Sequence, residues 1–234
     1  MLDFHSHILP AIDDGAKDTD ESIAMLKMLK EQGVNTVALT PHYIATDESP
    51  AEFLARREES FKELKKAIEK ENADVPQLLL GAEVYFYPGL LKMDDIDKLR
   101  LQNTNMLLLE MPMARWSEHS IREIIEFANS SGINLVLAHI ERYLKMQRKD
   151  IIDTLLDNDI MLQVNASFFN LKKTRRKALK MFRNNEIHFI GSDCHNTKYR
   201  PPHIKDALDV IREKFSDDTV NDFIKEQHEL IEIM

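Results

Sequence analysis

The feature that most constrains the fold of this chain is a regular alternation of short apolar runs with longer segments of helical period. The runs are rich in Val, Leu and Ile and lie at 2–7, 34–42, 78–84, 106–111, 133–140, 160–166 and 188–193. The helical segments lie at 20–33, 49–71, 117–132, 149–159, 173–185, 201–215 and 217–234. This alternation predicts repeated βα units in an α/β fold with a parallel sheet. About seven strands favour a closed barrel, with an open doubly wound sheet as the alternative.

Local signals support the helices and a single domain. Gly33 stands where a C′ residue would end the first helix, and Ser49 with Pro50 forms an N-cap and first-turn pair before the second. No linker rich in Pro, Gly or Ser, no low-complexity tract and no clear repeat interrupts the alternation. The sequence therefore predicts one domain over residues 1–234.

Charge and cysteine content narrow the class of protein. The chain carries 40 acidic and 31 basic residues, a net charge of −9, which argues against nucleic acid or an anionic membrane as the main partner but leaves room for a local basic patch. No apolar stretch approaches the roughly 20 residues of a membrane-spanning helix, so no membrane insertion is expected. The lone cysteine, Cys194, and an N-terminus without signal-peptide features predict a cytoplasmic location.

The histidines gather where a parallel barrel carries its chemistry, at the C-terminal ends of the strands. Of nine histidines, five lie at or just after a predicted strand end: His5, His7, His42, His139 and His195. Residues two apart on a strand face the same way, so the first two are expected to point together. The other four, His119, His188, His203 and His228, are expected to be exposed or simply packed.

Carboxylates occur at the same level of the predicted sheet. They are Asp13, Asp14, Glu83, Glu110 and Asp193. Any one of them is explained by a helix cap or a salt bridge, but five together with five histidines favour a bound cation. Imidazole and carboxylate without thiolate favour Mn²⁺, Fe²⁺ or Zn²⁺, and so many ligands imply more than one ion. Such clusters polarise water to hydroxide for displacement at phosphorus.

Six motifs carry a resemblance to a known superfamily over nearly the whole chain. They are "HSH", "TPH", "GAE", "LLLEM", "AHIER" and "GSDCH", in this order. Together they resemble the polymerase-and-histidinol-phosphatase (PHP) superfamily, and the opening "DFHSHILPAIDDGAKDTDES" resembles its manganese-dependent protein-tyrosine phosphatases of bacterial capsular and exopolysaccharide systems. The resemblance implies a distorted TIM-like (β/α)₇ barrel, the PHP fold, with a trinuclear metal centre.

The resemblance also implies which residues hold the metal ions. It divides them into a first set of His5, His7, Glu83 and Asp193, a second in which Glu83 is joined by Glu110 and His139, and a third of Asp14, His42 and His195. Asp13 remains the alternative to its neighbour Asp14. The ions are expected to be manganese, with iron or zinc as alternatives.

Two arginines match the phosphate-binding positions of the resemblance, Arg142 in "HIERY" and Arg200 in "TKYRPP". A guanidinium group presents a fork that matches phosphate oxygens and stabilises transition-state charge, so a catalytic role follows. The implied activity is hydrolysis of phosphotyrosine on the tail of a bacterial tyrosine kinase that governs capsular or exopolysaccharide synthesis.

Other functions remain to be weighed against this one. Cys194 and Arg200 have the Cys-x₅-Arg spacing of thiolate phosphatases, but the loop has no glycine, and strand alternation should aim the cysteine away from Asp193. A small-molecule phosphomonoesterase such as histidinol-phosphate phosphatase is the main alternative, because the same centre serves any phosphomonoester. A polymerase-associated exonuclease is disfavoured by net charge. A non-catalytic metal-binding adaptor is disfavoured because the ligands and both arginines are present.

Overall fold

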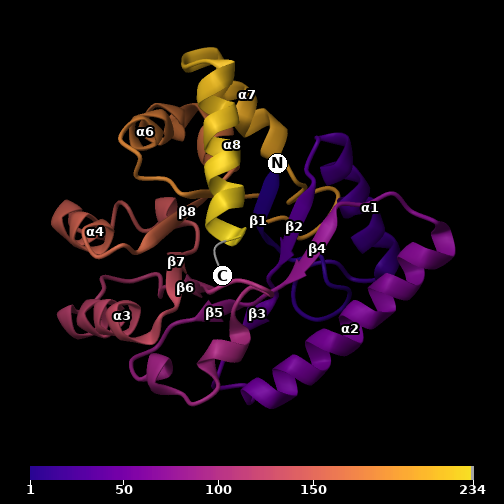
Figure 1. The fold of residues 1–234 in the computed structure, drawn as a ribbon, viewed down its shortest axis with the longest axis horizontal. Coiled ribbons are helices and arrows are strands. Elements are labelled where there is room, and N and C mark those ends of the chain that lie inside the picture. Colours follow the sequence, from indigo (N-terminus) through magenta and orange to yellow (C-terminus); the bar gives the residue numbers. More distant parts are fainter. Residues whose placement is uncertain (233–234) are drawn as a thin grey trace.

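Nine parallel strand segments occupy seven positions around a curled sheet in the computed structural model, which describes residues 1–232 (Figure 1). The segments are β1 (Leu2–Ser6), β2 (Thr36–Leu39), β3 (His42–Tyr43), β4 (Gln77–Leu80), β5 (Glu83–Tyr85), β6 (Met106–Glu110), β7 (Asn134–Leu137), β8 (Met161–Asn165) and β9 (Phe189–Gly191). Every neighbouring pair is parallel, in the orders β1-β2-β4 and β3-β5-β6-β7-β8-β9. The expected α/β class is confirmed.

Backbone hydrogen bonds just beyond β9 bring the sheet round to β1. The Asp193 N–H donates to the His5 carbonyl at 2.8 Å, and the His7 N–H donates to the Cys194 carbonyl at 3.0 Å. On the interior, the rings of Phe4 and Phe189 stack with centroids 4.0 Å apart. These contacts make the barrel, not the open sheet, the architecture of the chain.

Two expected strands, 34–42 and 78–84, are each broken into two segments. The first breaks at Pro41, which has no N–H to donate to a ladder, and separates β2 from β3. The second breaks at Gly81, where an added Cβ would lie 3.3 Å from Thr40 and 3.2 Å from Leu101. The expected strand 133–140 also stops early, at Leu137, because His139 adopts a left-handed φ of 32°.

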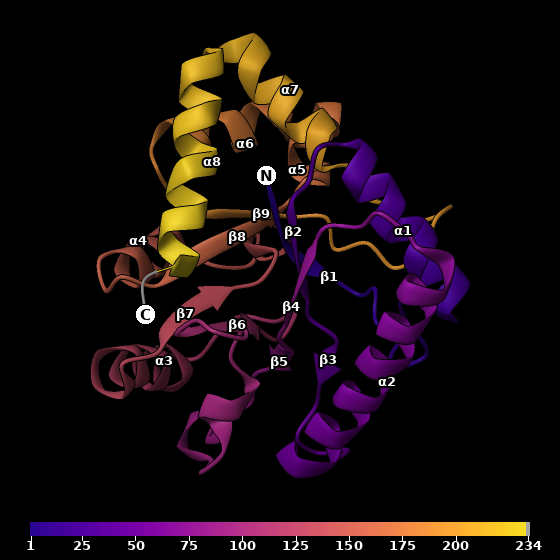
Figure 2. The ribbon, with the colours of Figure 1, turned by 45° about the vertical axis from the view of Figure 1, so that its right-hand side comes forward.

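Helices surround the sheet (Figure 2). They are α1 (Thr19–Glu31), α2 (Pro50–Glu71), α3 (Glu118–Ser131), α4 (Lys149–Leu156), α5 (Ser167–Asn170), α6 (Lys172–Arg183), α7 (Ile204–Lys214) and α8 (Asp217–Glu232). The expected caps are confirmed: Ser49 and Glu52 form a capping box, and Gly33 has a φ of 83°. The last two residues of the expected C-terminal helix, 233 and 234, lie outside the described residues.

Short helical segments were not anticipated from the sequence. The one-turn helix α5 and the 3₁₀ segments Leu90–Lys92, Ile96–Leu99 and Ile140–Arg142 are too brief to leave a helical period in the sequence. None of the helices in residues 1–232 is long and apolar enough to cross a membrane.

The apolar side chains form two cores on the two faces of the sheet. The larger core packs the outer face of the strands against the helices. The smaller fills the barrel interior, where Leu2, Phe4 and Met106 meet Ile231 of α8. Because Leu2 and Met106 begin their strands, α8 covers the N-terminal end of the barrel, which leaves the other end for polar groups.

An irregularity in β1 turns the histidines toward the interior. Asp3 pairs with Val37 and Ser6 pairs with Leu39. Between these two pairs β1 therefore advances by three residues while β2 advances by two. This extra residue, a β-bulge, shifts the alternation of side chains along the strand. Interior packing therefore passes from Leu2 and Phe4 to His5 and His7 at the C-terminal end.

Candidate metal centre

His5 and His7 point their ring nitrogens at one another from the end of β1, as expected. Their Nε2 atoms are 3.1 Å apart, and Glu83 Oε2 lies 3.2 Å from the first and 3.3 Å from the second. Asp193 Oδ1 is 3.9 and 3.6 Å from the same two nitrogens. All four side chains are buried. The residues of the first expected ligand set therefore converge on one point.

The second expected set meets at the other oxygen of Glu83. His139 Nε2 lies 2.8 Å from Glu83 Oε1 and 3.4 Å from Glu110 Oε1. His42 contacts the same two carboxylates through their other oxygens, with its Nδ1 3.0 Å from Glu83 Oε2 and 3.9 Å from Glu110 Oε2. Glu83 thus stands between the two sets, as a bridging carboxylate would.

The third expected set gathers around Asp14, which follows β1. Its Oδ1 lies 3.4 Å from His42 Nε2 and 3.3 Å from His195 Nε2. The side chain is 65% exposed, so the third set is the outermost. His7 belongs to this group as well as to the first, and His42 presents one nitrogen to each of two groups. The structure thus brings all nine expected ligands together, with less sharply separated sets than the resemblance implies.

Asp13 is engaged in a different way from Asp14. Its Oδ2 accepts hydrogen bonds from His7 Nδ1 at 2.8 Å and from the His42 N–H at 3.0 Å, and its Oδ1 accepts from the Gly15 N–H at 2.9 Å. A carboxylate that holds the far nitrogen of a histidine is a common support for a metal ligand. Of the two adjacent acids, Asp14 faces the centre and Asp13 orients His7.

The hydrogen bonds of the histidine rings fit a cation. His5 Nδ1 lies 3.3 Å from Gln163 Oε1, and His195 Nδ1 lies 3.0 Å from the Asp193 carbonyl oxygen. Oxygen acceptors at Nδ1 favour the tautomer that carries its proton there, as Asp13 does for His7. With a cation bound in place of the second proton, the Nε2 lone pair of all three rings would be directed at the centre. The donor set, imidazole nitrogen with carboxylate oxygen, suits a divalent transition metal.

The electrostatics of the centre attract positive charge. Burial opposes protonation of His7, but hydrogen bonds to Asp13 and Glu83 outweigh it and raise the pKa to about 10. Burial likewise opposes protonation of His139, whose pKa rises to about 9 because of Glu110 and Glu83. Burial would raise the pKa of Asp193, yet the charges of His5 and Arg142 hold it well below its usual range. The Asp193 carboxylate thus stays ionised in a buried place that a cation would neutralise.

Supporting polar residues around the ligands escaped the sequence reasoning. Gln163 Oε1 accepts from the His139 N–H at 2.7 Å, and Gln163 Nε2 donates to Asn165 Oδ1 at 3.0 Å. Asn165 Nδ2 in turn donates to Asp193 Oδ2 at 2.7 Å. Gly191 leaves room for these hydrogen-bonded side chains, because a Cβ at this position would lie 2.6 Å from the His5 Cβ. The sequence did contain a signal for them. Gln163 and Asn165 are two polar residues, two positions apart, at the end of the apolar run 160–166, so both face the same side of the strand.

Both expected arginines reach the centre through one carboxylate. Arg200 Nη2 lies 2.8 Å from Asp193 Oδ1, and Arg142 Nη2 contacts Asp193 Oδ2. The two guanidinium groups line a cavity of about 380 Å³ together with Asp193, Ser167 and Tyr199, whose side chain is 91% exposed. Two fixed positive charges beside the ligand cluster make this cavity suited to an anion such as a phosphate group.

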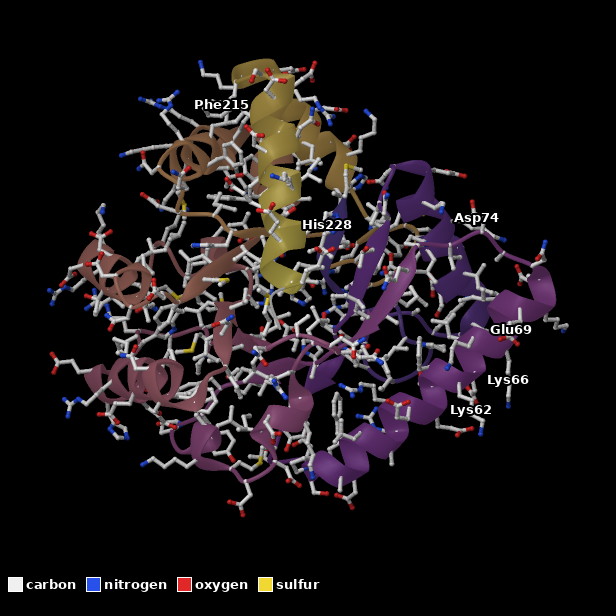
Figure 3. The ribbon with its side chains drawn as sticks, in the orientation of Figure 1. Lys62, Lys66, Glu69, Asp74, Phe215 and His228 are labelled. Carbon is white, nitrogen blue, oxygen red and sulfur yellow. The ribbon has the colours of Figure 1, made fainter. Side chains whose placement is uncertain are left out.

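The remaining candidates lie away from this chemistry. Cys194 is buried in the larger core, and burial raises the pKa of its thiol well above the ordinary value, so it does not face Arg200 as a nucleophile would. His119, His188, His203 and His228 belong to none of the ligand groups found in residues 1–232. Figure 3 shows His228 on α8, the helix that covers the N-terminal end of the barrel.

A family comparison covers almost the whole chain. The family model for capsular polysaccharide synthesis, CpsB/CapC, matches residues 1–232. The tyrosine-protein phosphatase CpsB of Streptococcus pneumoniae is 33% identical over 226 residues, which cover 92% of this chain and 91% of that protein. The tyrosine-protein phosphatase YwqE of Bacillus subtilis is 31% identical over 229 residues, covering 92% and 85%.

The fold is shared with solved relatives. A chain from the crystal structures of YwqE from Bacillus subtilis and CpsB from Streptococcus pneumoniae, which are metal-dependent tyrosine phosphatases, matches with a TM-score of 0.85. The match covers 98% of this chain and 94% of the solved one at 27% identity. It agrees with the PHP-type barrel expected from the sequence.

Proposed function

The chain belongs to the CpsB/CapC family of capsular polysaccharide synthesis, and from that premise we propose that it is a metal-dependent protein-tyrosine phosphatase. The observation that carries the proposal is the meeting of two features at one end of the barrel. Eight imidazole and carboxylate side chains form three candidate ligand groups there, His139 joins them through Glu83 and Glu110, and two arginines contact Asp193 of the cluster. Ligands for divalent ions beside guanidinium groups suit the hydrolysis of a phosphate ester.

We propose that the centre holds three divalent ions, with manganese ahead of iron or zinc. The ligands are His5, His7, Asp14, His42, Glu83, Glu110, His139, Asp193 and His195. Bound metal would supply activated water and neutralise charge on the phosphoryl oxygens. The number of converging donors supports several ions, since one ion uses four to six ligands.

Arg142 and Arg200 bind the phosphoryl group in this proposal. The reaction forms a bond between a water oxygen and phosphorus and breaks the bond from phosphorus to the phenol oxygen, which takes up a proton. Negative charge redistributes over the phosphoryl oxygens as this happens, and preorganised guanidinium forks stabilise it. Asp193 holds both forks in place from behind the cavity. Attack by water needs no covalent enzyme intermediate, so no protein nucleophile takes part.

The substrate we propose is phosphotyrosine on the tail of a bacterial tyrosine kinase that regulates capsular or exopolysaccharide synthesis. The family's role in capsule synthesis and the tyrosine-phosphatase relatives support it. The exposed ring of Tyr199 at the mouth of the cavity offers an aromatic face to a phenyl ester. We also propose that this single-domain protein works in the cytoplasm. Its one cysteine is free and buried, which suits a reducing compartment where proteins do not depend on disulfide bonds.

A comparison of two substrates tests the proposal. The manganese-loaded protein should hydrolyse a phosphotyrosine peptide with a kcat/KM at least tenfold above that for histidinol phosphate, because only the peptide presents an aromatic ester. Release of inorganic phosphate measures both. A preference for histidinol phosphate would instead assign the chain to small-molecule phosphomonoester hydrolysis, and no turnover of either would overturn the enzymatic assignment.

A further inference from the structure

One helix concentrates positive charge in an otherwise acidic protein. Helix α6 spans twelve residues, of which seven are basic and none is acidic. Six of the basic side chains are exposed, and we call them the basic face: Lys172, Lys173, Arg176, Lys177, Lys180 and Arg183. The opposite side of the helix packs Ala178, Met181 and Phe182 into the core. The basic face is therefore fixed in orientation by packing and directed at solvent.

These charges are not used within the protein. Among residues 1–232, no side chain of the basic face forms an ion pair, whereas neighbouring surface helices pair theirs, as in Lys149 with Asp153 and Lys205 with Asp209. Glu186 acts on Lys177 through its charge without pairing with it, and its carboxylate accepts a hydrogen bond from Asn184. Burial lowers the pKa of Lys177, and the nearby Lys145 lowers it further.

The arrangement is unfavourable at the start of the helix. Lys172 and Lys173 stand in the first turn of α6, where the helix dipole favours negative side chains, and no side chain caps this end. Like charges four residues apart, such as Lys172 with Arg176, also destabilise a helix. These charges destabilise α6, and no acidic side chain of the fold within residues 1–232 pairs with them. This indicates that their partner is another molecule.

The basic face begins beside the cavity of the candidate centre. Ser167, in α5, lines the cavity with Arg142 and Arg200, and α6 begins five residues later. A hollow of about 1120 Å³ follows α6 and takes in Lys214 at the end of α7. Figure 1 shows α6 at the periphery of the barrel. Lys172, Arg176 and Lys180, four residues apart, extend about 12 Å along the helix.

We propose that the basic face binds an acidic stretch of the protein substrate that adjoins the phosphotyrosine in the cavity. This inference rests on the proposed phosphatase function and adds a second contact to it. A peptide fits better than an anionic membrane because the basic side chains line a hollow along α6, and the one large apolar side chain exposed at the start of this helix is Leu171, 48% exposed. Complementary charge speeds encounter and strengthens binding without taking part in bond cleavage.

A matched pair of triple variants tests the proposal. One is Lys172→Gln with Arg176→Gln and Lys180→Gln on α6. The control is Lys62→Gln with Lys66→Gln and Lys70→Gln, which has the same spacing on α2, and Lys62 and Lys66 are labelled there in Figure 3. Three substrates are compared: para-nitrophenyl phosphate, a phosphotyrosine peptide with flanking Asp and Glu, and the same peptide with Asn and Gln instead.

The α6 variant should raise KM for the acidic peptide about tenfold, because each exposed charge contact contributes a factor of about two to three. Its kcat, and its kinetics on the other two substrates, should match the parent, as should those of the α2 control. Salt should raise the parent's KM for the acidic peptide more steeply than the variant's. An unchanged KM in the α6 variant, or an equal rise in the control, would overturn the proposal.

A binding measurement separates this inference from the proposed function. A fluorescent acidic peptide without phosphotyrosine should bind the parent and the α2 control, and bind the α6 variant about tenfold more weakly. That result would stand even if the parent proved unable to hydrolyse phosphotyrosine. If the α6 changes instead abolished binding to vesicles of anionic lipid and left peptide affinity unchanged, the face would be a membrane contact and the peptide proposal would be wrong.

Discussion

The Asp13 carboxylate accepts a hydrogen bond from His7 Nδ1 at 2.8 Å, on the side of the ring that faces away from the ligand cluster. The other hydrogen bonds that Asp13 accepts come from the backbone N–H groups of His42 and Gly15. A residue in this position controls the orientation and tautomer of a metal ligand without contacting the metal.

Asp13→Asn should therefore weaken metal binding by about 10- to 100-fold and leave a centre that excess Mn²⁺ can restore. Asp14→Asn removes a proposed ligand and should lower the maximum number of ions bound, even at saturating metal. Titration of each variant with Mn²⁺, read by metal content and by phosphotyrosine turnover, distinguishes the two. If Asp13→Asn lost an ion irrecoverably while Asp14→Asn kept all of them, the roles would be reversed.

Substitution of the two arginines should leave the metal content unchanged, whereas substitution of a proposed metal ligand should lower it. Arg142→Ala and Arg200→Ala should keep near-normal metal while losing roughly 10²–10³ in kcat/KM, the scale of one preorganised transition-state contact. Lysine at either position should rescue only part of the activity, because it keeps the charge and loses the fork. Elemental analysis and kinetics on the same samples check this. Parent-like turnover in both alanine variants would refute the assignment.

Cys194 should be dispensable for catalysis. Its thiol is buried in the core, and burial raises its pKa, so Cys194→Ser should keep kcat/KM within about threefold of the parent if it folds. Cys194→Ala serves as a second variant that leaves no buried hydroxyl. Circular dichroism confirms folding in each case. Trapping a phosphocysteine on the parent would make the thiol the nucleophile and contradict attack by water.

The stability of the protein should decline between pH 7 and pH 5 partly through His188. Burial lowers the pKa of His188, whose Nδ1 accepts a hydrogen bond from the Leu162 N–H at 3.1 Å, so the folded state holds the ring neutral. The unfolded state takes up a proton below its ordinary pKa of about 6.5, and the free energy of unfolding then falls with pH until the folded pKa is passed.

His188→Gln should flatten this decline in urea-unfolding experiments at a series of pH values and fixed Mn²⁺. His119→Gln, at an exposed position on α3, is the control and should follow the parent curve. A parent-like slope for His188→Gln would show that other groups carry the pH dependence.

The sequence predicted the positions of the strands but not the irregularities of their backbone. Alternation of apolar runs and helical periods predicted all seven strand positions, because burial on both faces of a parallel strand leaves a continuous apolar run. It did not predict the interruptions at Pro41 and Gly81, where local backbone geometry overrides an apolar run. Nor did it predict the bulge in β1, which changes the facing of side chains without changing the composition of the strand.

The convergence of these histidines and carboxylates was predictable because imidazole and carboxylate are rare at the ends of apolar strands, and their role as metal ligands stays a proposal. The residues that hold these side chains in place were harder to predict. Gln163 and Asn165 are neutral polar residues whose role depends on reaching His5, His139 and Asp193 from a neighbouring strand, and a single sequence does not display such pairs. Likewise the choice between Asp13 and Asp14 depends on which way each side chain turns, since the two are adjacent and chemically identical.

The most direct test of the account measures metal content and phosphotyrosine-peptide turnover on the same purified sample during stepwise chelation. Turnover should fall in parallel with the divalent ions released and return when Mn²⁺ is added back, while His5→Ala and Asp193→Ala should recover neither the full metal content nor the activity. Undiminished turnover in a sample verified as metal-free would contradict the central claim that this cluster of histidines and carboxylates is a catalytic metal centre.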